Sequence, residues 1–129
     1  MKILIGSSMR FRDVVKATIK CMNELGLQPL CPNVDQISEN RDVADSPETK
    51  KRLALEYYEA IEKCDAVYFI VPEGYIGTSL KIELGYALAL KKPVYFSEPT
   101  KDIAIDTFAA GIIPLNNIEL FKNAVHLER

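Results

Sequence analysis

The sequence has few of the residues that support metal or thiol chemistry. It carries one histidine, His126, close to the C-terminus, and three cysteines, Cys21, Cys31 and Cys64, with no CxxC pair among them. A structural zinc site therefore has no signature, and a cysteine nucleophile activated by histidine is not expected. Each cysteine stands in an apolar context, which favours small buried side chains in a reducing cytoplasm. We expect neither a metal nor a cofactor.

An excess of one charge and a long apolar run are also missing. The formal net charge is −2, whereas proteins that bind nucleic acid or anionic membranes normally carry a basic excess. No stretch approaches about 18 uncharged apolar residues, so no membrane span is expected, and the apolar run at 2–5 is too short for a signal peptide. Hydrophobic residues make up 48% of the chain, which is enough for the core of a single domain over 1–129.

Short apolar runs alternate with helical spacings along the chain. The apolar runs predict strands at 2–5, 27–31, 66–71 and 94–97, with a weaker one at 112–115. The helical spacings predict helices at 11–25, 47–63, 78–90 and 118–125. Ser46 and Pro47 form a good start for the second helix, as N-cap and first helical residue. This alternation predicts an α/β three-layer sandwich with a four- to five-stranded parallel sheet, centred on the run at 66–71.

The predicted topology also indicates where a ligand would bind. In open parallel sheets, ligands lie beyond the carboxyl ends of the strands, where the strand order reverses. The loops 6–10, after the first strand, and 72–78, after the third, should flank that crevice. The polar segment 33–47 is long for a connection in a compact domain, and loops of that length are often lids or binding segments.

The loop after the first strand begins Gly-Ser-Ser. Gly6 permits a tight turn, while Ser7 and Ser8 offer hydroxyls and amides that suit an anion or a sugar hydroxyl. Arg10 could pair with a phosphate. No Gly-Lys-Ser/Thr follows, so this is not a P-loop, and a plain strand-to-helix turn with an N-cap serine explains the same residues.

The loop before the helix at 78–90 contains an aromatic side chain. Two glycines flank Tyr75 and Ile76, and Thr78 or Ser79 can cap the helix that follows. A tyrosine beside a crevice can stack on a planar base. Alternatively, Tyr75 packs against a neighbouring chain.

Glu83 is the one carboxylate in the helix predicted at 78–90, which is apolar on most sides and should be largely buried. A buried, unpaired carboxylate either destabilises the folded protein or has a shifted pKa, so the presence of Glu83 in this helix requires an explanation. In one interpretation it pairs with Lys81 or another surface lysine. In the other it projects into the crevice as a nucleophile or base, and Gly85 lets another group pack close to the helix.

Three segments together resemble the nucleoside 2-deoxyribosyltransferase-like superfamily. They are Gly-Ser-Ser-Met-Arg-Phe at 6–11, Asp-Ala-Val at 65–67 and the long motif Gly-Tyr-Ile-Gly-Thr-Ser-Leu-Lys-Ile-Glu-Leu-Gly-Tyr-Ala at 74–87. The resemblance covers roughly residues 2–97. It implies a flavodoxin-like fold and cleavage or exchange of the N-glycosidic bond of a nucleoside or nucleoside 5′-monophosphate, with Glu83 attacking the anomeric carbon.

The resemblance also implies which residues hold the small-molecule substrate. Those expected to bind it are Gly6, Ser7, Ser8, Met9, Arg10, Phe11, Glu73, Tyr75, Gly77, Thr78 and Ser79. The chain departs from the better-characterised transferases at two places where they carry an aspartate. It has Gly-Thr-Ser at 77–79 and Leu-Glu-Tyr-Tyr-Glu at 55–59.

These departures leave several functions open. A transferase, a hydrolase acting on a nucleotide with Arg10 near the phosphate, and a non-catalytic nucleotide-binding or sensing domain all suit the sequence. An FMN protein is a further alternative, faintly matched by Ser7 and Ser8. The resemblance implies a homo-oligomer, and the pairs Tyr75-Ile76 and Tyr57-Tyr58 are the candidate contact surfaces.

Overall fold

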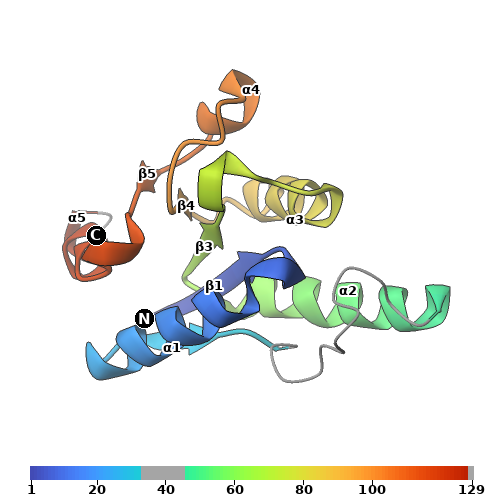
Figure 1. Ribbon diagram of the computed structural model, residues 1–129, viewed down its shortest axis with the longest axis horizontal. Coiled ribbons are helices and arrows are strands. Elements are labelled where there is room, and N and C mark those ends of the chain that lie inside the picture. The colour runs from blue at the N-terminus through green and yellow to red at the C-terminus, as the bar shows by residue number, and fades with distance from the viewer. Residues whose placement is uncertain (33–45, 128–129) are drawn as a thin grey trace.

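The computed structural model describes residues 1–32 and 46–127 (Figure 1). The segment 33–45, most of the expected lid or binding loop, lies outside the described residues.

A five-stranded parallel sheet forms the centre of the molecule. Its strands are β1 (Lys2–Ser7), β2 (Gln28–Leu30), β3 (Ala66–Ile70), β4 (Val94–Phe96) and β5 (Gly111–Ile112). Their order is β2-β1-β3-β4-β5, and every neighbouring pair is parallel. All residues of β3 are buried, because this strand is covered on both faces and paired on both edges. The predicted sheet and its central strand are confirmed.

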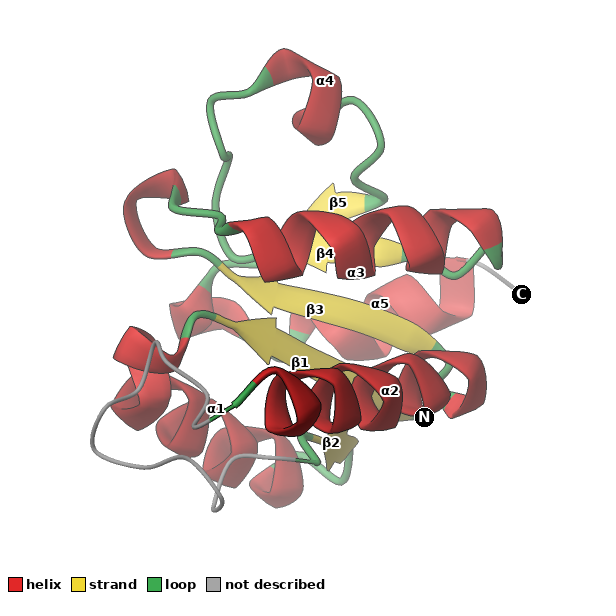
Figure 2. Cartoon of the chain, turned by 90° about the vertical axis from the view of Figure 1, so that its right-hand side faces the viewer, coloured by secondary structure: helices red, strands yellow, loops and turns green. Residues whose placement is uncertain are grey.

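Helices cover both faces of the sheet. They are α1 (Arg12–Glu24), α2 (Pro47–Lys63), α3 (Thr78–Ala89), α4 (Ile103–Asp106) and α5 (Leu120–Leu127), with 3-10 turns at Met9–Phe11, Pro72–Gly74 and Leu115–Asn117. One core cluster joins α1 and α5 to the sheet, and a second joins α2 and α3 to its other face. Figure 2 shows α2 and α3 in front of the sheet and α1 and α5 behind it. The predicted three-layer sandwich is therefore confirmed.

The start of α2 and the end of α1 lie where the capping residues in the sequence predict them. Ser46 accepts a hydrogen bond from the Thr49 amide at 3.1 Å, and Pro47 occupies the first helical position. Gly26 adopts a φ of 80°, a left-handed conformation that ends α1 at little steric cost. The short α4 was not expected; it lies beyond the end of the sheet (Figure 2), with Ile105 packed against the core cluster of α2 and α3. Within the described ranges, no helix is long and apolar enough to cross a membrane.

Candidate active site

The two predicted loops lie side by side at the carboxyl edge of the sheet. Ser7 at the end of β1 is in register with Ile70 at the end of β3, and the Ser7 hydroxyl donates to the Ile70 carbonyl at 2.9 Å. Beyond these ends, the Arg10 guanidinium lies 4.4 Å above the ring of Tyr75. Phe11 contacts the same ring edge-on, with 6.1 Å between centroids. The sheet therefore brings Arg10 and Phe11 together with Tyr75, as the topology predicts.

The first loop is not a plain capped turn. The Phe11 amide donates to the Ser8 carbonyl at 3.0 Å, which closes a 3-10 turn that includes Met9. Phe11 is the N-cap of α1 and provides no side-chain hydrogen bond, so the alternative with an N-cap serine is wrong. The hydroxyl of Ser7 is already used to join the two strand ends.

Position 6 requires a glycine because neighbouring side chains leave no room for a Cβ atom there. A Cβ at this buried position would lie 2.5 Å from the ring of Phe69 and 3.2 Å from the Tyr57 hydroxyl. That hydroxyl donates to the Ile5 carbonyl. Tyr57 is only 8% exposed, so the expectation that Tyr57 and Tyr58 together form a contact surface is wrong. Tyr58 is half-buried and packs on Tyr86 instead.

The loop after β3 has an unusual backbone conformation at two successive residues. Glu73 and Gly74 both have positive φ angles, 58° and 79°. A Cβ at Gly74 would lie 2.8 Å from the Pro99 carbonyl oxygen, so this loop packs tightly against the loop after β4. Glu73 is exposed. Tyr75 is 40% exposed and leans over Gly77.

The first turn of α3 differs from its predicted form. Gly77 is the N-cap, in an extended conformation without a side-chain hydrogen bond, so Thr78 and Ser79 do not cap the helix. Both are exposed. The Ser79 hydroxyl instead accepts a hydrogen bond from the Lys50 ammonium, at 3.1 Å.

Glu83 is half-buried, and its carboxylate group is incompletely hydrogen-bonded. Its Oε2 atom is buried and has no hydrogen-bond partner among the described residues. Side chains of a helix lean toward its N-terminus, so the carboxyl group lies toward the turn that holds Ser79. Burial raises its pKa from 4.5 to about 8, opposed by the charge of Lys50. The charge that acts on Glu83 therefore comes from Lys50, one of the surface lysines that the first interpretation allowed besides Lys81.

Tyr57 borders the same carboxylate. Burial raises the pKa of its phenol well above the ordinary value, and the negative charge of Glu83 raises it further. Lys50 and Tyr57 were both absent from the sequence prediction of the site. They lie two helical turns apart on one face of α2, and this spacing of polar groups was the available signal.

The rest of α3 is less buried than predicted. Leu80, Leu84 and Ala87 face the core, but Ile82 is 55% exposed. Gly85 is exposed, and a Cβ there would meet nothing within 4 Å. Gly85 therefore serves no close approach among the residues that the structure describes.

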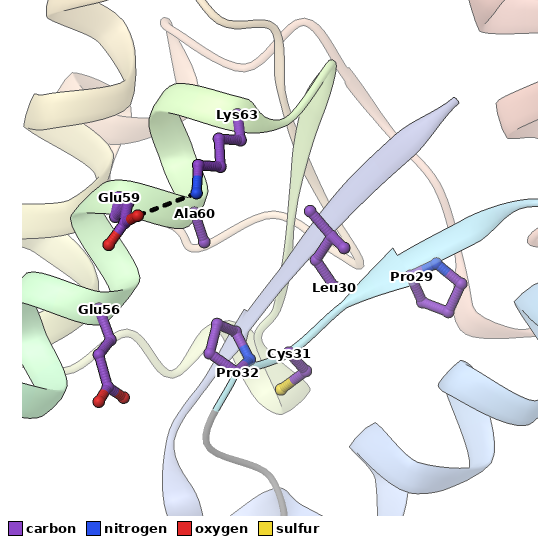
Figure 3. A pocket seen from close by; sticks show the side chains of 8 residues that line it. All are labelled: Pro29, Leu30, Cys31, Pro32, Glu56, Glu59, Ala60 and Lys63. Atoms are coloured by element: carbon purple, nitrogen blue, oxygen red, sulfur yellow. Dashed lines mark hydrogen bonds and ion pairs between the residues drawn. The ribbon is translucent and has the colours of Figure 1, made fainter.

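A separate hollow of about 380 Å³ lies between β2 and α2 (Figure 3). It is lined by Pro29, Leu30, Cys31, Pro32, Glu56, Glu59, Ala60 and Lys63. Two of its charged groups are joined by an exposed ion pair, with 2.9 Å between the Lys63 ammonium and the Glu59 carboxylate. None of the predicted site residues lines this hollow.

Known proteins with this architecture include enzymes. The 2-deoxyribosyltransferase of the psychrotolerant bacterium Bacillus psychrosaccharolyticus is 26% identical and matches 92% of this chain and 90% of its own, with a TM-score of 0.71. The chain has the nucleoside 2-deoxyribosyltransferase-like fold. The CMP N-glycosidase BcmB of Clostridium botulinum also has this fold, at 18% identity, with 98% and 99% of the two chains covered and a TM-score of 0.55.

A third similar structure is of a protein described by a different activity, so the fold alone does not define the function. It is a 3-dehydroquinate dehydratase-like protein from Bifidobacterium longum, 16% identical, with 100% of this chain and 98% of that one covered and a TM-score of 0.53. No protein-family model and no curated protein matches the sequence. Any assignment of activity therefore depends on the residues of the site.

Proposed function

We propose that the protein cleaves or transfers the N-glycosidic bond of a nucleoside or nucleoside 5′-monophosphate through a glycosyl-enzyme on Glu83. The observation that carries the proposal is the buried Glu83 carboxylate, whose Oε2 has no partner among the described residues. Glu83 belongs to α3, the helix that follows the carboxyl end of β3, and a deoxyribosyltransferase and a CMP N-glycosidase have the same fold. A buried carboxylate without a structural partner is a candidate for chemistry.

The reaction proceeds by two displacements at the anomeric carbon. A carboxylate oxygen of Glu83 bonds to C1′ as the bond from C1′ to the base nitrogen breaks, and the departing base takes the electron pair and a proton from the solvent. Water then attacks C1′, gives up a proton and releases Glu83 as a carboxylate. A second base in place of water gives transfer instead of hydrolysis.

Tyr75 and Arg10 form the expected contacts to the two ends of a nucleotide. The partly exposed ring of Tyr75 suits a nucleobase, because aromatic rings stack on bases through their faces. Arg10 now covers that ring. A base that stacks there displaces the guanidinium, which can then pair with the 5′-phosphate.

Arg10→Gln is therefore expected to raise KM for nucleoside 5′-monophosphates by about 10- to 100-fold, because a hydrogen bond to a charged group is worth about 1.5–3 kcal/mol. KM for the corresponding nucleosides should change much less. Steady-state kinetics on matched pairs of substrates measure both, with the exposed Lys20→Gln on α1 as control. An equal increase for both substrate types would contradict the assignment of Arg10 to the phosphate.

Release of free base tests the proposed function. The purified protein is incubated with a panel of nucleosides and their 5′-monophosphates, with and without a second base, and the products are separated by chromatography. Free or exchanged base is expected for at least one substrate. Ligand-induced increases in melting temperature without any base release would favour the non-catalytic nucleotide-binding domain.

We also propose that the protein is a cytoplasmic homo-oligomer. Its described cysteines are all free thiols, which suits a reducing compartment. Large apolar side chains are exposed outside the site, above all Ile103 at 83% and Phe108 at 59%, and such groups are common in subunit contacts. Light scattering should give a mass of at least a dimer, and a monomeric mass at micromolar concentration would contradict this.

A further inference from the structure

The start of α2 fixes the backbone of Lys50 but does not account for the position of its side chain. Lys50 lies in the first turn of α2, where its amide donates to the Ser46 carbonyl at 3.0 Å, so its backbone is fixed by the capped start of the helix. Its ammonium crosses to the neighbouring helix and donates to Ser79. This contact holds a flexible, exposed side chain at the beginning of α3.

The contact places a positive charge beside the buried carboxylate. Ser79 is one helical turn before Glu83, and the Glu83 side chain leans toward that turn. Among the described residues, Lys50 is the charged group that acts on Glu83, and the charge of Glu83 in turn acts on Tyr57; both partners come from α2. The Tyr57 phenol stays uncharged at working pH, since its pKa is raised well above the ordinary value. Lys50 therefore supplies the counter-charge.

A nucleophilic carboxylate must be ionised, and burial opposes ionisation. An ammonium a few ångströms from a carboxylate favours its charged form, by an amount that falls with added salt.

We propose that Lys50 is a positioning residue for the nucleophile, held on Ser79 so that its ammonium favours the charged form of the Glu83 carboxylate before substrate binds. Its effect on the rate rests on the proposed function, whereas its effect on Glu83 does not. Lys50 needs no contact with the reacting atoms.

The test compares Lys50→Met with Lys50→Arg and with Lys51→Met, an exposed neighbour on a different side of α2. The ionisation of Glu83 is followed directly by NMR of ¹³C-labelled glutamate, with Glu83→Gln to identify its signal. The titration midpoint of Glu83 should move to higher pH in Lys50→Met. It should stay near that of the wild type in the other two variants.

Kinetics give a second, separate result. At pH 6.5, kcat/KM of Lys50→Met should fall about 3- to 10-fold, since the expected change is about half to one pH unit, while at pH 9.5 it should match the wild type. A merely structural role would lower kcat/KM equally at both pH values. The loss at pH 6.5 should be restored in Lys50→Arg.

Two results would overturn the inference. One is an unchanged Glu83 titration in Lys50→Met. The other is an increase in KM confined to 5′-monophosphates with an unchanged pH profile, which would make Lys50 a phosphate ligand. If no variant and no wild-type sample releases base, the proposed function fails, and the NMR titration still decides the role of Lys50.

Discussion

Glu83→Gln is expected to reduce base release by at least about 10³-fold and, at the same time, to make the protein more stable. Removing a nucleophile eliminates the covalent route. The gain in stability arises because Glu83 titrates at about 8 in the folded chain and at 4.5 in its ordinary state. At pH 7 the folded protein must hold a proton that the unfolded chain has released, at a cost of about 3 kcal/mol. Chemical denaturation and a base-release assay measure the two effects.

The gain in stability should depend on pH in a defined way. Below pH 4.5 the carboxyl group is protonated in both states, and this contribution vanishes. Between pH 4.5 and about 8 the folded state binds more protons than the unfolded state, so wild-type stability falls relative to Glu83→Gln as the pH rises. Glu119→Gln, at an exposed position, is the control. A Glu83→Gln variant that unfolds more readily than the wild type would contradict the burial of this charge.

The pH profile of the reaction should rise with pH. If ionised Glu83 attacks C1′, kcat/KM increases about tenfold per unit below the pKa and levels off above about 8. From pH 6 to pH 8 the expected increase is therefore about 50-fold. Initial rates of base release across this range, under subsaturating substrate, provide the measurement.

The opposite slope has a distinct meaning. If Glu83 acts as a proton donor to the leaving base, kcat/KM is highest at low pH and declines through about 8. Such a profile would contradict the nucleophile and reassign the same residue as a general acid. A flat profile would remove Glu83 from the rate-determining chemistry.

The destabilising carboxylate resembles the strain found at many functional sites. A leucine or glutamine at position 83 would fold at lower cost, beside the apolar Leu80 and Leu84 of the same helix. The fold tolerates the carboxylate because the rest of the core is well covered: all of β3 is buried.

The fold and the position of the two loops could be predicted because they depend on local patterns. Runs of buried apolar residues identify β1 and β3, and the carboxyl ends of neighbouring parallel strands meet at one edge. The four residues of α4 are too few for a helical period. Its end is instead held by Asp106, which accepts hydrogen bonds from Thr100 and Lys101, and such contacts leave no periodic signal.

The supporting residues of Glu83 could not be predicted because they depend on packing between helices. Tyr57 and Tyr58 are adjacent and looked equivalent, but successive residues of a helix point about 100° apart. One therefore enters the core, whereas the other packs on Tyr86. Lys50 looked like one of several surface charges in its helix. Its role depends on where α2 places it relative to Ser79.

Trapping the glycosyl-enzyme tests Glu83 as the nucleophile most directly. Nucleosides and 5′-monophosphates with fluorine at C2′ of the sugar slow both displacements, because fluorine destabilises the oxocarbenium-like transition state. Intact-mass spectrometry with peptide mapping should find one fluorinated sugar on the peptide that contains Glu83, formed with release of one equivalent of base and absent from Glu83→Gln. An adduct on another residue, or undiminished base release by Glu83→Gln, would contradict the proposed mechanism.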